Sequence, residues 1–181
     1  MFNTNNNVKE VIEKMQLSQK ERMLLEDQKS HEEMCIKKYS SYAQQAQDPQ
    51  LKQLFNDYAS QEQQHLDTIQ QILNGQVPNT SGQQGQQAGQ QGQQNSGQGS
   101  AGQQGSMNLG AQGFMQNQND AVLCQDALMT EKYVSGAYNT TIFECTDTTI
   151  RQVLNHIQKE EQQHGEGIFN YMRKTGHYTV Q

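Results

Sequence analysis

The sequence predicts an all-α protein: a four-helix bundle made of two repeated antiparallel helical hairpins, joined by a long flexible crossover. Three observations predict this fold. Apolar residues recur at helical spacing in two stretches, one on each side of a central tract that is nearly devoid of large apolar residues. An Asp in each stretch stands where a second helix would begin. The two stretches also repeat each other at a constant offset of 99 residues, without a gap.

The repeat is centred on a Glu-x-x-His motif, which occurs at residues 62–65 and again at 161–164. Glutamine is so common in this chain that the QQ pair inside each motif carries no weight. The other positions matter more, because all of them recur at the same offset. The repeated pairs are Glu32 and Glu131, Tyr39 and Tyr138, Asp48 and Asp147, and Ile69 and Ile168.

A Glu and a His three residues apart lie on one face of a helix, so both can bind the same metal ion. One such motif alone is typical of an ordinary polar helix face. Two copies, each preceded by Glu-x6-Tyr, provide four carboxylates and two imidazoles, which is the ligand set of a di-iron or di-manganese bundle. The alternative is a duplicated hairpin that holds no metal. The candidate ligands are Glu32, Glu62, His65, Glu131, Glu161 and His164.

Composition argues against several classes of function. The chain has 181 residues and a net charge of −6, and no block of Lys and Arg supports binding to nucleic acid or to an anionic membrane. No apolar run approaches the ~18 residues of a transmembrane helix. The N-terminus lacks the apolar core of a signal peptide, so we expect a protein made in the cytoplasm that does not use the general secretory route.

The three cysteines, Cys35, Cys124 and Cys145, have no CxxC spacing and are odd in number. Cys35 and Cys124 fall on the apolar faces of their predicted helices. This favours small core residues, with redox relays or interchain disulfides as alternatives.

The first hairpin is expected over residues 18–75, after an N-terminal arm over 1–17 whose residues 8–17 suit a lid or docking helix. Ser18 and Glu21 form a capping box that opens the first helix. Glu32 is the acidic residue in its apolar stripe, and a buried carboxylate needs a partner such as a metal. Asp48 and Pro49 then begin the second helix as its N-cap and first residue, so the two helices are antiparallel. Gly75 is the expected C-terminal cap of the second helix.

Residues 76–119 are expected to be a linker, because Gln, Gly, Ser and Asn bury too little apolar surface to offset chain entropy. Its root-mean-square span of ~37 Å allows it to cross the bundle. The tract is either a passive spacer or an arm whose glutamines are cross-linked to lysines of other chains. The second hairpin is expected over 120–181, with a third helix from near Asp120, a fourth capped by Asp147, and an end at Gly176.

Parts of the chain resemble two known protein families. The halves with Glu-x6-Tyr and Glu-x-x-His, and the run EEMCIKKYSSYAQQA at 32–46, resemble ferritin-like proteins, in particular rubrerythrin. That resemblance implies a ferritin-like bundle in which the six candidate ligands bind two Fe or Mn ions. It also implies that Tyr39 and Tyr138 support ligand carboxylates.

The stretch from Asp126 to Tyr178 is similar to the Coat F family of bacterial spore coat proteins. It carries DALMTEKYVSGAYN at 126–139, IRQVLNHIQKEEQQ at 150–163 and YMRKTGHY at 171–178. This family implies a spore coat location and other coat proteins as partners, and a homo-oligomer is compatible with it. The expected function is therefore a spore coat protein with a di-metal site.

Two alternatives stay open at this point. One is a di-metal oxidoreductase that acts on peroxide, like rubrerythrin or manganese catalase, and the other is a metal-free coat scaffold. In an enzyme, Tyr58 would be the candidate donor of a proton or an electron, although a tyrosine at this position also suits plain packing.

Overall fold

The computed structural model describes residues 16–76, 78 and 109–178, and the side chains of all of these except 109–118. Four helices make up the described chain: α1 (Gln19–Gln45), α2 (Pro49–Leu73), α3 (Leu109–Glu144) and α4 (Thr148–Lys174). The described residues contain no strand, so the all-α prediction is confirmed. Nearly all of the expected N-terminal arm, and the glutamine-rich part of the linker over 79–108, lie outside the described residues.

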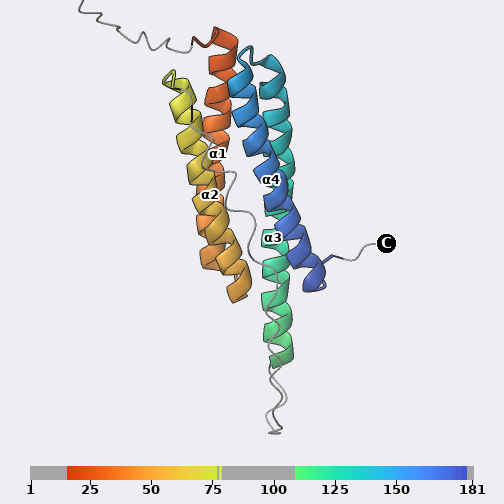
Figure 1. Cartoon of the computed structure of the whole chain (residues 1–181). Helices are drawn as coiled ribbons and strands as arrows, with labels where there is room; N and C mark the ends of the chain where they lie inside the picture. The colour runs from red at the N-terminus through yellow and green to blue at the C-terminus, as the bar shows by residue number, and fades with distance from the viewer. Residues whose placement is uncertain (1–15, 77, 79–108, 179–181) are drawn as a thin grey trace, which may run out of the picture.

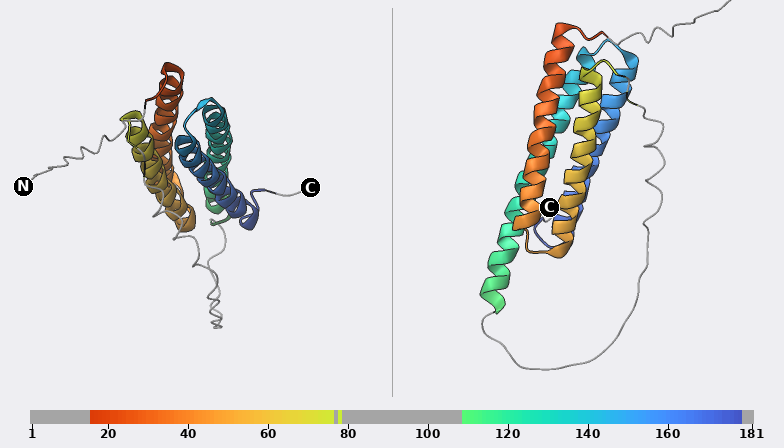
Figure 2. Two further views of the ribbon diagram at one scale, coloured as in Figure 1. Left: turned by 45° about the horizontal axis from the view of Figure 1, so that its top comes forward. Right: turned by 90° about the vertical axis from the view of Figure 1, so that its left-hand side faces the viewer.

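The helices form two antiparallel hairpins, α1 with α2 and α3 with α4, which lie side by side (Figure 1). Helix α2 ends at the end of the bundle where α1 begins, whereas α3 begins at the opposite end (Figure 2). The chain between α2 and α3 therefore has to cross the length of the bundle, as the predicted long crossover requires.

The helix ends follow the predicted capping residues. Ser18 and Glu21 form a complete capping box at the start of α1. Asp48 caps α2, with Pro49 as its first residue, and Asp147 caps α4 through the backbone N–H groups of residues 149 and 150. Gly75 and Gly176 follow the ends of α2 and α4 with φ of 76° and 77°, a left-handed conformation that favours glycine.

Two buried carboxylates at repeated positions, one in each hairpin, accept hydrogen bonds from the loop that joins the two helices of the other hairpin. Glu21 accepts hydrogen bonds from the N–H (2.7 Å) and the hydroxyl (2.9 Å) of Thr146, between α3 and α4. Asp120, 99 residues after Glu21, accepts from the N–H groups of Gln47 (2.8 Å) and Asp48 (2.9 Å), between α1 and α2. The 99-residue repeat therefore also relates these two sets of hydrogen bonds, which form only when the two hairpins pack together.

The core is filled from the predicted faces of all four helices and includes the three cysteines, which are free and buried. Burial raises the pKa of Cys124 to about 12 and that of Cys145 to about 11, so both thiols stay protonated at neutral pH. These properties fit core residues and disfavour interchain disulfides.

Helix α3 departs from the predicted boundaries. It was expected to begin near Asp120 and to match the other helices in length, but it begins at Leu109 and has 36 residues, against 27, 25 and 27 in α1, α2 and α4. The predicted linker over 76–119 is therefore wrong for its last part. Once a helix exists, each added residue forms a hydrogen bond without a new nucleation cost, so the less Gly-rich residues 109–119 can extend it. The added turns project past the connection between α1 and α2 (Figure 2).

None of the helices, as far as the structure describes them, is long and apolar enough to span a membrane.

Candidate metal centre

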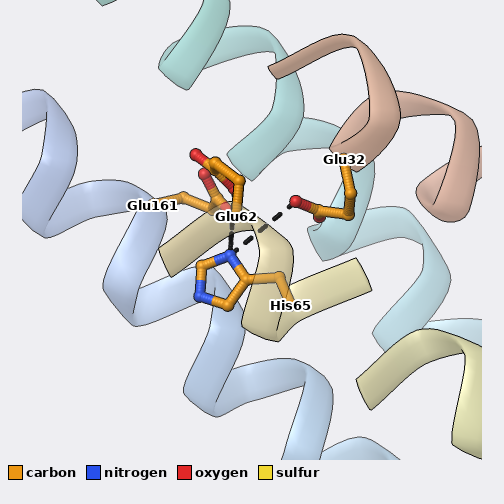
Figure 3. A group of neighbouring side chains, drawn as sticks. All are labelled: Glu32, Glu62, His65 and Glu161. Carbon is orange, nitrogen blue, oxygen red and sulfur yellow. Dashed lines mark hydrogen bonds and ion pairs between the residues drawn. The ribbon is translucent and has the colours of Figure 1, made fainter. Parts of the chain in front are cut away.

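All six predicted ligands meet in the middle of the bundle, and all four helices contribute. They are buried, with exposed fractions of 0–3%. Figure 3 shows how Glu32 from α1 and Glu161 from α4 approach Glu62 and His65 of α2. The helical period explains this convergence, because the Glu and His of each motif share the face that points into the core.

One group of possible ligands surrounds His65. Its Nδ1 atom lies 3.0 Å from Oε2 of Glu62, 2.9 Å from Oε1 of Glu161 and 3.7 Å from Oε2 of Glu32. One atom from each of these four side chains lies within 4.8 Å of the others, which suits a single ion. We call this group the first position.

The second position is the counterpart around His164. Its Nδ1 atom lies 3.1 Å from Oε1 of Glu62, and 3.8 Å from Oε2 of both Glu131 and Glu161. Glu62 and Glu161 thus belong to both groups and direct one oxygen toward each histidine. This geometry favours Glu62 and Glu161 as the carboxylates that would bridge two ions, a choice that the sequence left open between this pair and Glu32 with Glu131.

The pKa values of the four clustered carboxyl groups indicate that this site favours added positive charge. Burial raises the pKa of Glu32 to about 8; burial and the neighbouring Glu161 raise that of Glu131 to about 10; burial and Glu62 raise that of Glu161 to about 7. Burial has the same tendency at Glu62, but hydrogen bonds from both histidines outweigh it and lower the pKa of Glu62. The protein alone therefore holds protons where metal ions would supply positive charge.

Several buried oxygens of the cluster accept no hydrogen bond from the residues that the structure describes. They are Oε2 of Glu32, Oε2 of Glu131 and both oxygens of Glu161, of which Oε1 has only its ion-pair contact of 2.9 Å with Nδ1 of His65. Buried polar atoms are rarely left this way, because the loss of water is then uncompensated. All four belong to the two positions, so the donor set fits a pair of divalent cations that prefer oxygen and imidazole ligands.

Two protein-family models match this chain, and each match lies mainly over one of the two hairpins that form the centre. Residues 119–181 match the Coat F domain. Residues 23–90 match Rubrerythrin. The chain matches no curated protein and no solved structure at a significant level. The two resemblances noted in the sequence are thereby confirmed, and each family covers one hairpin. Below, the Coat F half means α3 and α4, and the rubrerythrin half means α1 and α2.

Tyrosine hydroxyls connect the two halves across the centre. Tyr39 of the rubrerythrin half donates a hydrogen bond to Glu131 of the Coat F half, and Tyr138 donates one in return to Glu32. Both tyrosines are fully buried. Both hydroxyls thus lie next to candidate ligand carboxylates, and the supporting role that the resemblance implies stays a prediction, since such bonds would fix the orientation of a ligand.

We expect Tyr39→Phe and Tyr138→Phe each to lower the free energy of unfolding by about 1–3 kcal/mol, because each leaves a buried carboxylate without its donor. Tyr42→Phe is the matched control, since the hydroxyl of this half-buried residue also bonds a carboxylate, Asp126, but one that is partly exposed. Denaturant unfolding measures all three. Losses no larger than that of the control would mean that the crossed hydrogen bonds add nothing particular to the centre.

The sequence did not reveal the outer partners of the two histidines. Nε2 of His65 lies 3.0 Å from Oε2 of Glu160, and Nε2 of His164 lies 2.6 Å from Oε1 of Gln61. Glu160 and Gln61 occupy the same position of the repeat, directly before a ligand Glu, and each reaches across to the opposite half. A comparison of the two repeats position by position would have pointed to this pair, but only the fold shows that they contact histidines.

Tyr58 packs on the centre and does not lie among its carboxylates. Its ring lies 4.2 Å from that of His164, with 31° between the ring planes. Gly167 allows this position, because a Cβ there would lie 1.9 Å from the Tyr58 hydroxyl oxygen. Tyr58 therefore packs against His164, and a role as donor of a proton or an electron stays a prediction.

Proposed function

We propose that this protein is a spore coat component whose bundle holds two iron or manganese ions. One observation carries the proposal: two buried groups of four ligands each, which share Glu62 and Glu161. The Coat F match supports assembly with other coat proteins, and the Rubrerythrin match supports the metal. In such a centre Glu32 and His65 would complete the first position, and Glu131 and His164 the second.

Iron or manganese would supply a redox centre, because carboxylate-rich ligation suits metals that change oxidation state. The protein residues have separate tasks around it. Glu62 and Glu161 would hold the two positions together, and Tyr39 and Tyr138 would fix the terminal carboxylates. Reduction or dismutation of peroxide is the second candidate function, and the Rubrerythrin match over residues 23–90 is the observation that favours it.

Metal content tests the proposal. Protein expressed in medium supplemented with iron and manganese is expected to contain two ions per chain by elemental analysis, and anomalous scattering at the Fe and Mn edges should place them at the two positions. Glu32→Gln should lose one ion, whereas Glu33→Gln, its neighbour on a more exposed face, should keep both.

The outcome separates the alternatives. Wild-type protein without metal after this treatment would favour the metal-free scaffold. Two bound ions without consumption of added peroxide would keep the metal centre and remove the oxidoreductase.

A further inference from the structure

A pocket of about 540 Å³ lies between α3 and α4, and its wall includes two of the proposed ligands, Glu131 and Glu161. Small residues open it: Ser135 and Gly136 on α3 and Gly165 on α4. Lys132 adds a positive charge to the wall. Glu131 belongs to the second position alone and Glu161 to both, so the wall of the pocket has more in common with the second position than with the first.

The rubrerythrin half carries larger or oppositely charged side chains at the equivalent places, 99 residues earlier. Gly165 corresponds to Leu66, which is 7% exposed, and Ser135 corresponds to Ile36, which is partly buried. The two halves of the bundle therefore differ in the size of the side chains between the candidate metal centre and the surface.

The charge differs as well. Lys132 corresponds to Glu33, which pairs with Lys29 at 3.9 Å. An anion approaching the pocket is thus attracted by Lys132, which is exposed, whereas at the equivalent place of the other half the charge of Glu33 is paired with Lys29.

We propose that the pocket between α3 and α4 is a binding site for small anions, through which they reach the second metal position. The inference rests on the proposed metal centre and adds to it the entry route and the class of ligand. It makes the two positions unequal: the second exchanges ligands with solvent, and the first is enclosed.

The outer partners of the histidines agree with this division and are an independent observation. Glu160 gives His65 a carboxylate partner, whereas Gln61 gives His164 a neutral amide. A carboxylate makes an imidazole the more basic ligand, so the first position should hold its ion more firmly than the second.

Azide binding to the iron-loaded full-length protein tests the route, followed by the change in its absorption spectrum. Gly165→Leu copies Leu66 into the pocket and should weaken azide binding at least tenfold while two irons stay bound. Gly165→Ala is the graded control, because its Cβ would make only ordinary contacts of 3.6 Å with Glu131 and Leu128. Lys132→Gln should slow azide binding and make its rate less dependent on salt.

A second variant that narrows the pocket controls for a direct effect of Gly165→Leu on the neighbouring residue His164. Ser135→Ile copies Ile36 and narrows the same pocket from α3, at a residue that is not adjacent to a ligand in sequence. Unchanged azide binding in both variants, with two irons present, would overturn the route and leave the metal centre standing. Wild-type protein that binds no iron would instead remove the proposed centre, and the route with it.

Discussion

Glu161→Gln is expected to abolish the stabilisation that metal gives and to leave the metal-free protein almost unchanged. Glu161 belongs to both positions, so its loss should weaken both ions. Without metal, its pKa is raised to about 7 by burial and by Glu62, so at pH 6 it is largely the neutral acid that Gln imitates in shape and charge.

The size of the effect follows from mass action. An ion present at 1,000 times its dissociation constant stabilises the folded state by about 4 kcal/mol. For a chain of this length, that corresponds to a rise in melting temperature of roughly 8–16 °C for each bound ion. Wild-type protein should show this rise between chelator and manganese, and Glu161→Gln should not.

Glu166→Gln is the matched control, an exposed residue of the same helix that should behave like the wild type. Equal destabilisation of Glu161→Gln with and without metal would identify Glu161 as a packing residue. A variant that keeps two ions would show that Glu161 does not bridge them.

The metal-free protein is expected to lose stability as pH rises from 6 to 9. Burial raises the pKa of Glu32 to about 8 and, with Glu62, that of Glu161 to about 7, whereas an unfolded Glu titrates near 4.5. The folded state therefore keeps protons that the unfolded chain has released, and its advantage declines as pH rises through the folded values. Each proton so held contributes about 1.4 kcal/mol per pH unit.

His65 acts in the same direction. Burial would lower its pKa, but contacts with Glu160, Glu161, Glu32 and Glu62 outweigh burial and raise it well above 6.5, so its contribution is complete below pH 6.5 and is lost as pH rises through the raised value. Glu62 has a lowered pKa, so its contribution is already complete above pH 4.5 and does not change in this window.

Metal should reverse the trend, because the ions replace these protons and bind more tightly at higher pH. Thermal melts at pH 6 and pH 9, in chelator and in manganese, measure both curves. Glu32→Gln should flatten the chelator curve, since one titrating group is gone. A wild-type curve in chelator that is flat or rises over this range would contradict the proposed protonation of the centre.

Much of the fold and the convergence of the six candidate ligands could be predicted because they depend on local rules and on the repeat. Ser18, Asp48 and Asp147 mark helix starts through their side chains, and the constant offset places each Glu-x-x-His on a helix face of the same phase. What escaped prediction depends on contacts between helices. Burial of Glu21 and the outer histidine partners Glu160 and Gln61 arise only when the two halves meet.

The early start of α3 escaped for a different reason. Residues 109–119 contain good helix formers beside two glycines and two asparagines, but their composition groups them with the glutamine-rich tract. A helix that is already anchored by packing can recruit such residues, which a count of apolar residues does not register.

The crossed hydrogen bonds of Tyr39 and Tyr138 have a consequence for how the molecule comes apart. Each hairpin supplies the hydroxyl that the buried carboxylate of the other requires, and Glu21 and Asp120 repeat this exchange at the two ends. Neither hairpin can detach without breaking these hydrogen bonds and exposing the apolar core that both share. We therefore expect the halves to melt as one cooperative unit, even though more than thirty residues of chain separate α2 from α3.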